Sequence, residues 1–219
     1  MRDTLYVINP NSSEAVTAGI ATAMALLRQP DGPRIECVTL ADGPPGVQTQ
    51  QDVDRAALSV VRFAQERQAD AAGFVTACFS DPGLHMLREM PGVLSLGISE
   101  CGALTAMTLG QRFGVIAILQ GSIARHWRNW GAMGITQRVA GEVAIGRGVA
   151  ELSDHAATLA AMVAAGLRLR DEHGANVLLM GCAGMAAFRA PLQDATGLPV
   201  VEPTQAAVSM ALGRIQIGW

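Results

Sequence analysis

Short runs of β-branched and other apolar residues alternate with longer helical patterns along the whole chain. The short runs have the length of strands and the longer ones the length of helices. Such alternation predicts βα units, in which a parallel sheet is buried by helices on both faces. The expected strands span residues 5–8, 35–40, 72–76, 93–98, 113–119, 136–140, 176–180 and 199–201. The expected helices span residues 13–28, 53–68, 83–89, 101–109, 122–133, 153–173, 185–194 and 204–212.

Serine residues stand close to several of the expected helix starts. A serine side chain at this position accepts a hydrogen bond from a free backbone N–H group of the first turn. We therefore expect Ser12 or Ser13, Ser122 and Ser153 to be N-caps. Asp81, directly before Pro82, is expected to begin a further helix.

The chain contains a weak internal repeat. The strand pattern GFVTAC that ends at Cys78 returns as VLLMGC at Cys182, and the pattern at residues 7–9 returns at 115–117. The fold class expected from this repeat is α/β, with two pseudosymmetric lobes that each hold a parallel sheet flanked by helices. The N-terminal lobe is expected to comprise residues 1–97 plus 202–219, and the C-terminal lobe residues 98–201. Ligands of open α/β sheets bind beyond the carboxyl ends of the strands, which predicts an active site in the cleft between the lobes.

The composition narrows the choice of function. Half of the 219 residues are hydrophobic and 16% are charged, which favours a packed interior over disorder. The net charge of −3 provides no basic face for nucleic acid. Lysine is absent, which excludes a lysine Schiff base and the phosphate-binding loop that needs a Gly-Lys step.

The chain is also expected to be a cytoplasmic protein that makes no contact with a membrane. Its longest stretch of low polarity, residues 156–167, is shorter than the ~20 residues that cross a bilayer. The first residues form a strand pattern, with no apolar signal segment before a cleavage site. In that compartment the four cysteines are expected to be thiols, and their spacing does not fit a zinc site.

Cys78 and Cys182 are the strongest candidates for chemistry. Each follows an apolar strand and precedes a turn into a helix, where free N–H groups and the helix dipole favour a thiolate. Such surroundings lower a cysteine pKa to between roughly 3.5 and 7.5, which is the expectation for both. The alternative is that each is a small buried hydrophobe, but two cysteines at equivalent places of a repeat favour a function. Cys37 and Cys101, by contrast, are expected to be core residues.

Two polar turns accompany the candidate cysteines. The turn at residues 9–13 holds Asn11, which can either shape the turn or present its amide to a ligand carbonyl group. Ser80 follows Cys78 closely and can donate a hydrogen bond to a substrate oxygen. The sequence leaves the structural and the ligand-binding role open for both turns, since one residue can cap a helix while another binds the ligand.

Four sequence blocks resemble those of the Asp/Glu/hydantoin racemase superfamily, most closely its hydantoin and allantoin racemase branch. They are NPNSS at 9–13, CFSDPGL at 78–84, GCAGM at 181–185 and PVVEP at 199–203. The resemblance implies two pseudosymmetric α/β lobes, no cofactor, and a pair of thiols that flank the substrate. It assigns catalysis to Cys78 and Cys182, and substrate contacts to Asn11, Phe79, Ser80 and Ala183. No metal is expected either, because the spacing of the cysteines does not fit a metal site.

The chain also departs from the family's pattern near the expected substrate. Family members often carry threonines where this chain has Ala117 and Ile118, and hydantoin racemases often have an acidic residue in place of Ser80. The related arylmalonate decarboxylases keep only the cysteine that matches Cys182. Because this chain has Cys78 as well, the resemblance favours an isomerase that uses two bases.

We therefore expect a cofactor-independent racemase that inverts an acidic α-carbon of a small carbonyl compound. A 5-substituted hydantoin or allantoin is the first candidate substrate. Cis–trans isomerisation of maleate and decarboxylation of an arylmalonate are the enzymatic alternatives. From another class, the chain could be a catalytically silent protein that binds a small ligand between two lobes. The expected partners are a small-molecule carbonyl substrate and further copies of the chain in a homo-oligomer.

Overall fold

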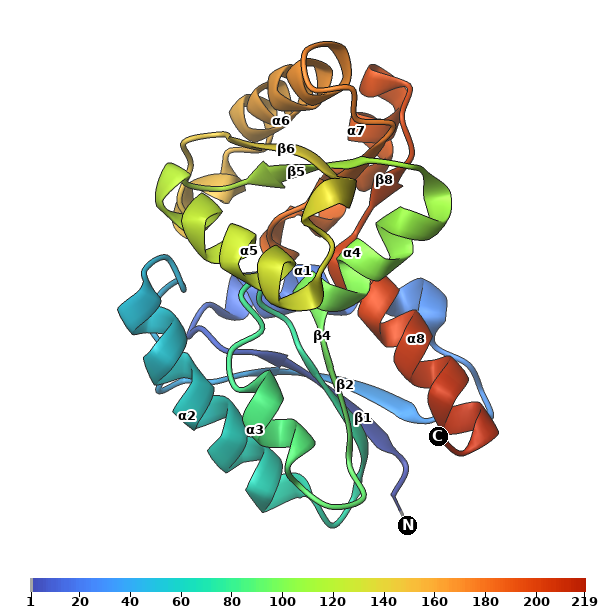
Figure 1. Cartoon of the computed structure of the whole chain (residues 1–219). Coiled ribbons are helices and arrows are strands. Elements are labelled where there is room, and N and C mark those ends of the chain that lie inside the picture. Colours follow the sequence, from blue (N-terminus) through green and yellow to red (C-terminus); the bar gives the residue numbers. More distant parts are fainter. Residues whose placement is uncertain (1) are drawn as a thin grey trace.

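Eight parallel strands form two separate four-stranded sheets in the computed structural model, which describes residues 2–219 (Figure 1). The strand order is β2-β1-β3-β4 in the first sheet and β6-β5-β7-β8 in the second, so the two sheets share one topology. The predicted α/β fold with two similar parallel sheets is therefore confirmed. The strands are β1 (Thr4–Asn9), β2 (Arg34–Thr39), β3 (Ala71–Thr76), β4 (Leu94–Gly97), β5 (Phe113–Ala117), β6 (Val139–Ala144), β7 (Val177–Met180) and β8 (Val200–Val201).

Eight α-helices and four 3₁₀ segments connect the strands within the described part of the chain. The α-helices are α1 (Glu14–Ala23), α2 (Gln50–Arg67), α3 (Leu84–Arg88), α4 (Ile98–Leu109), α5 (Gln120–Met133), α6 (His155–Asp171), α7 (Arg189–Thr196) and α8 (Pro203–Ile217). The 3₁₀ segments are η1 (Ala25–Leu27), η2 (Thr136–Arg138), η3 (Val149–Ser153) and η4 (Ala183–Phe188). In residues 2–219, no helix combines the length and apolar character needed to cross a membrane.

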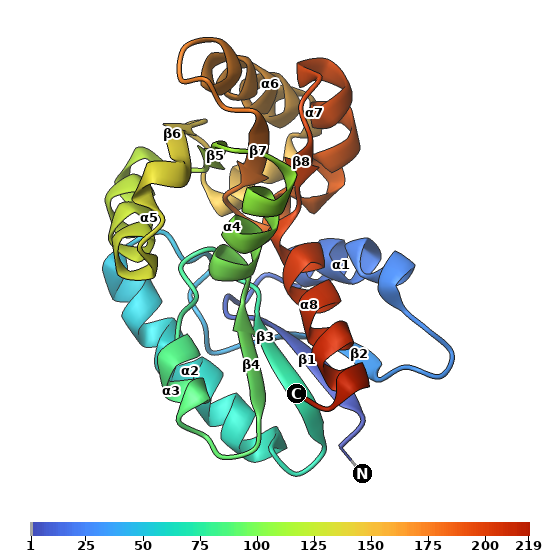
Figure 2. The same cartoon turned by 45° about the vertical axis from the view of Figure 1, so that its right-hand side comes forward.

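Each sheet buries side chains on both faces because successive residues of a strand point in opposite directions. In β1, Leu5 and Val7 pack with residues of α1 and α8, whereas Tyr6 and Ile8 pack with residues of α2 and α3. Figure 2 shows these helix pairs on opposite sides of the first sheet. In the second sheet, α4 and α5 cover one face and α6 and α7 the other.

The helices that follow the last strand of each sheet are exchanged between the lobes. Helix α4 follows β4 of the first sheet but packs against β7 of the second, and α8 follows β8 but packs against β3 of the first. The two helices also contact each other (Figure 1). The exact lobe boundaries at residues 97 and 201 remain predictions, and residue 1 of the first lobe lies outside the described residues.

The repeat seen in the sequence corresponds to equivalent hydrogen bonds in the two sheets. The N–H of Ala77 donates to the carbonyl of Ile8, 2.8 Å away, and the N–H of Gly181 donates to the carbonyl of Ile116, 2.9 Å away. Thr76 pairs with Ile8 in the same register as Met180 pairs with Ile116. Cys78 and Cys182 therefore follow equivalent strands at equivalent edges of the two sheets.

Several predicted elements differ from the structure. The strand expected at 136–140 is instead a 3₁₀ turn followed by β6, which contains Gly141 and Glu142. Residue types that are rare in strands occur there because Glu142 has a buried histidine partner and Gly141 lies against the ring of His173. The helix expected at 185–194 is a 3₁₀ segment followed by α7, and the helix expected at 13–28 ends at Ala23.

The predicted helix caps were partly wrong. Ser13 does cap α1, since its hydroxyl accepts from the N–H of Val16. Ser122 lies inside α5 and donates to the carbonyl of Leu119, and the cap of α6 is Asp154, not Ser153. Asp81 does not begin the helix after it: α3 starts after Gly83, and Asp81 caps α4 instead.

Candidate active site

The two candidate cysteines line one cavity between the sheets. Cys78 and Cys182 each lie two residues beyond the end of their strand, β3 and β7. The N–H of the second residue after each cysteine, Ser80 or Gly184, is directed at the thiol and favours its thiolate form. The two lobes therefore present a thiol in the same local setting from two sides.

All six predicted site residues contribute to this cavity. The structure brings together Cys78, Cys182, Asn11, Phe79, Ser80 and Ala183. The remaining lining residues are Val16, Val47, Ala77, Ile118, Ser122, Arg125, His126, Val149, Gly181 and Gly184. The lining is largely apolar, with polar groups at a few places, as is usual for small-molecule sites.

The cavity is small, and a larger one adjoins it. The space between the cysteines is about 40 Å³, whereas a cavity that accommodates benzene measures about 150 Å³. The neighbouring cavity of about 220 Å³ shares Val16, Val149, Ala183 and Gly184 with the first and extends to Leu152 and Phe188. A ring-sized ligand between the thiols therefore requires the lobes or the lining side chains to move apart.

Burial raises the pKa of both thiols, contrary to the expectation from the sequence. Desolvation raises the pKa of Cys78 to about 12 and that of Cys182 to about 11, and the N–H groups of Ser80 and Gly184 oppose this only in part. Repulsion by the charge of a Cys182 thiolate also raises the pKa of Cys78. The sequence indicated the backbone N–H groups that lower the thiol pKa. It could not indicate the desolvation of the sulfurs, which has the larger effect on the pKa.

A buried carboxyl group accompanies each thiol. Asp81 accepts hydrogen bonds from the N–H groups of Ser99 and Glu100 at the start of α4, at 2.9 and 3.0 Å. Burial raises the pKa of Asp81 to about 7. Glu202 accepts from two N–H groups at the start of α8, and burial raises its pKa as well. Asp81 and Glu202 in turn raise the pKa of Cys78 and Cys182, respectively.

Asn11 both shapes its turn and faces the cavity. Its Oδ1 accepts from the side chain of Asn9, at 3.0 Å, and from the N–H of Ser13, at 2.9 Å. The amide Nδ2 of Asn11 is therefore the group that can donate to a ligand. The side chain of Asn9 also donates to the hydroxyl of Thr17, which connects the turn to α1. This arrangement combines the two alternatives that the sequence left open.

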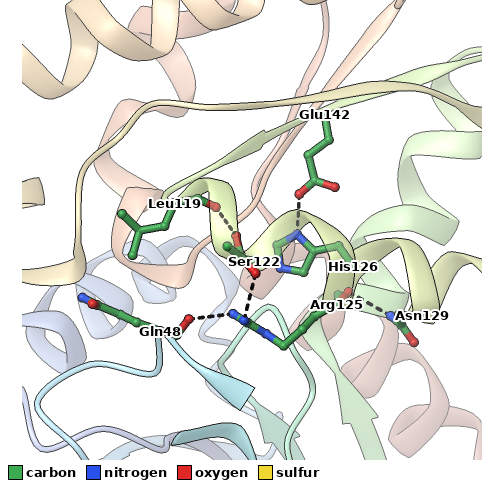
Figure 3. Close-up of polar contacts among 9 residues, drawn as sticks. Gln48, Leu119, Ser122, Arg125, His126, Asn129 and Glu142 are labelled. Carbon is green, nitrogen blue, oxygen red and sulfur yellow. Dashed lines mark hydrogen bonds and ion pairs between the residues drawn. The ribbon is translucent and has the colours of Figure 1, made fainter. Parts of the chain in front are cut away.

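Helix α5 contributes polar groups that the sequence did not identify (Figure 3). Arg125 lies in the cavity wall and donates to the carbonyl of Gln48, in the loop before α2, at 2.9 Å. His126 contacts Glu142 of β6 through Nδ1, and the side chains of this pair are 4% and 0% exposed. Phe79 packs edge-on against the His126 ring, with ring centroids 5.0 Å apart.

The signal for these residues was present but ambiguous in the sequence. His126 and Arg125 sit on a helix next to two tryptophans, a context typical of a core-facing surface. Their partners are Glu142, on a strand that was placed at the wrong residues, and Gln48, in a loop of the other lobe. In residues 2–219, no three His, Cys, Asp or Glu side chains gather in a way that could hold a metal ion.

Comparison with known proteins gives a consistent result along the whole chain. A family profile described as Asp/Glu/Hydantoin racemase matches residues 5–211. A hydantoin racemase from Rhizobium meliloti is 33% identical over 223 positions, which cover 98% of this chain and 90% of that protein.

Two solved structures extend the comparison. The allantoin racemase from Pseudomonas fluorescens superposes with a TM-score of 0.92 at 28% identity, covering 98% of this chain and 92% of the other. An arylmalonate decarboxylase superposes with a TM-score of 0.65 at 19% identity, covering 99% of this chain and 94% of the other. The second similarity reflects the fold alone.

Proposed function

Because the chain belongs to the Asp/Glu/hydantoin racemase family and is an isomerase of the racemase type, we propose that it inverts the acidic α-carbon of a small carbonyl compound. The proposed substrate is a 5-substituted hydantoin or allantoin, and the proposed bases are Cys78 and Cys182. One observation carries the proposal: two thiols from equivalent strand ends of the two lobes line a single cavity.

The proposed reaction needs one base on each face of the α-carbon. A thiolate on one side takes the α-proton, and the electron pair left on carbon is delocalised onto the neighbouring carbonyl oxygen as an enolate. The thiol on the other side then gives its proton to the opposite face of the carbon. The product has the inverted configuration, and the thiol and thiolate have exchanged places. Each sulfur must come within about 3–3.5 Å of the carbon for these transfers.

The apolar cavity supports proton transfer from carbon. Desolvation raises the pKa of both thiols, so a thiolate formed there is a stronger base than one in water. The enolate oxygen needs hydrogen-bond donors, and the backbone of the loops after the two cysteines can provide them. Removing one donor to a developing oxyanion costs about 2.7–4 kcal/mol of transition-state stabilisation in acyl-transfer enzymes, which indicates the scale.

The remaining parts of the proposal rest on the family resemblance and the composition. The reaction needs no cofactor or metal, because both proton transfers are made by side chains of the chain itself. We place the protein in the cytoplasm as a homo-oligomer that handles a small-molecule carbonyl substrate. The mass of the native protein in solution tests the oligomer directly.

The proposed activity is tested by proton NMR of enantiopure allantoin and 5-substituted hydantoins in deuterated water. The expected result is that the α-hydrogen signal and the optical activity of the substrate are both lost, in samples that contain the same concentration of enzyme. Carbon dioxide release from an arylmalonate without exchange would instead indicate a decarboxylase. Conversion of maleate through a covalent thiol adduct would indicate a cis–trans isomerase. Binding of these compounds with no exchange would overturn the proposal in favour of a silent binding protein.

A further inference from the structure

Arg125 is a positive charge in the wall of the cavity that pairs with no carboxylate among the described residues. Its guanidinium group is held by two neutral carbonyl groups, Gly121 at 3.2 Å from Nη1 and Gln48 at 2.9 Å from Nη2. None of the ion pairs within residues 2–219 involves Arg125. The groups whose negative charge favours its cation are the Cys78 thiolate, first, and then the carboxylates of Asp52 and Glu142, and both carboxylates lie beyond salt-bridge distance.

One donor of this guanidinium group is both buried and unsatisfied. The Nε atom of Arg125 has no hydrogen-bond partner among the described residues and is shielded from solvent. Burial also lowers the pKa of Arg125, which reflects the loss of water around its charge. A partly desolvated cation with an unpaired donor lowers the stability of the fold, because water no longer solvates the charge. An anion that accepts a hydrogen bond from this donor would offset that loss.

The charge of Arg125 contributes little to the ionisation of Cys78. Burial, the N–H of Ser80, and the charges of Cys182 and Asp81 all influence the pKa of Cys78 more than Arg125 does. The two carbonyl contacts instead hold the guanidinium group from both lobes. Gly121 belongs to α5, and Gln48, which Figure 3 shows beside Arg125, belongs to the loop before α2. A guanidinium group fixed in this way suits a planar carboxylate, which it recognises through a fork of parallel N–H groups.

We propose that Arg125 is a specificity-determining residue that binds a carboxylate on the substrate's 5-substituent. This inference rests on the proposed racemase function and names its substrate class: hydantoins derived from acidic amino acids, or ureides of the same charge. The reacting ring lies between Cys78 and Cys182, and the carboxylate-bearing arm points toward α5. The apolar cavity beside Ala183 and Phe188 lies on another side of the site and does not take this arm.

The test compares two nearly isosteric substrates, 5-(2-carboxyethyl)hydantoin and 5-(2-carbamoylethyl)hydantoin, which differ in charge. Rates of α-hydrogen exchange and racemisation give kcat and KM for each enantiopure compound. The wild-type protein should favour the carboxylate, mainly through a lower KM. Arg125→Gln should reduce the ratio of kcat/KM values, carboxylate over amide, by about 10–100-fold, the worth of a hydrogen bond to a charged group.

Two further variants make the result specific. Arg128 lies three residues after Arg125 on α5, outside the cavity lining, and donates to the side chain of Gln50 across the lobes. Arg128→Gln therefore removes a similar charge and a similar contact. This matched control should keep the substrate preference. Arg125→Lys retains the charge without the fork and should keep part of the preference, even if Arg125→Gln folds poorly.

Each outcome separates this inference from the proposed function. Exchange of the amide compound by the wild-type protein without a preference for the carboxylate would overturn the inference and leave the racemase intact. An equal loss on both substrates in Arg125→Gln would likewise overturn it, because it would indicate a general effect on the thiols or the enolate. Absence of exchange with both compounds and with allantoin would contradict the racemase, and the inference with it.

Discussion

Two opposing influences act on the thiol of each candidate cysteine. A backbone N–H two residues further along favours the thiolate, while the apolar cavity disfavours it more strongly. The sequence revealed the first influence, because a cysteine between a strand and a helix is visible in the pattern of residues. It could not reveal the second, which depends on Val47, Ile118 and Val149 closing around the sulfurs from distant parts of the chain.

The pH dependence of the reaction follows from these raised pKa values. In the proposed reaction the active form has one thiolate and one thiol. At neutral pH both thiols are expected to be protonated, since their pKa values are raised to about 12 and about 11. We expect kcat/KM for racemisation to increase from pH 7 to pH 9, approaching tenfold per pH unit, and to fall only where both thiols ionise. The apparent pKa values belong to the coupled pair.

The measurement is a pH–rate profile on a neutral substrate, with circular dichroism at each pH to verify that the protein stays folded. A profile that is flat between pH 7 and pH 9 would mean that a thiolate is already present at neutral pH. The cavity would then have to be more polar during turnover than it is here.

At the scale of helices and strands, short loops at the ends of β3 and β7 determine where the thiols lie. Gly181 precedes Cys182 at a close approach of β7 to β5, where an added Cβ would lie 2.7 Å from the carbonyl oxygen of Ile116. Ala77 holds the equivalent position before Cys78. The second lobe therefore has no room for a Cβ atom at this position, whereas the first lobe accommodates the methyl group of Ala77.

The substitution Gly181→Ala should displace Cys182 because the carbonyl group of Ile116 cannot move without disturbing β5. We expect the free energy of unfolding to fall by about 1–3 kcal/mol, as in overpacked interiors, and kcat/KM to fall with it. Urea unfolding and racemisation rates measure the two effects. Gly131→Ala is the control: its added Cβ on α5 would meet nothing within 4 Å, so stability should increase by about 0.5–1 kcal/mol. A Gly181→Ala variant as stable and active as the wild type would contradict the close approach.

Asp81 connects the loop after Cys78 to the start of α4, and its ionisation should be visible in the stability of the protein. Burial raises its pKa to about 7 from the ordinary value of 3.8. Between these values the folded state holds a proton that the unfolded state has lost, so this carboxyl group stabilises the fold at low pH and loses that contribution as the pH rises through 7.

Asn at position 81 has a similar shape and does not ionise. The difference in unfolding free energy between Asp81→Asn and the wild type should therefore shift in favour of the variant from pH 5 to pH 8. Urea unfolding at both pH values measures this, and other titrating groups cancel in the comparison. A shift in the opposite direction would mean that the N–H groups of Ser99 and Glu100 outweigh burial and hold Asp81 ionised.

At the scale of the whole molecule, the sequence predicts that the two lobes are pseudosymmetric. It predicts only some of the residues that the two lobes contribute to the site. The half-chain repeat correctly paired Ile8 with Ile116 and Cys78 with Cys182, because the apolar strand patterns are similar in both halves. Arg125 and its partner Gln48 come from different lobes, and no local pattern links them. The carboxyl groups beside the thiols also break the repeat, since one lies three residues after Cys78 and the other twenty residues after Cys182.

The most direct test of the two-thiol reaction uses Cys78→Ser and Cys182→Ser with each pure enantiomer of one substrate in deuterated water. A serine hydroxyl is a far weaker acid than a thiol, so it forms almost no anion to take the proton and donates its own proton poorly, and racemisation should be lost in both variants. The remaining cysteine still faces one side of the α-carbon, where it can remove a proton and return a deuteron. Each variant should therefore exchange the α-hydrogen of one enantiomer only, with retention of configuration, and the two variants should act on opposite enantiomers. Undiminished racemisation by either variant, or the same enantiomer preference in both, would contradict a reaction that passes a proton between two opposed thiols.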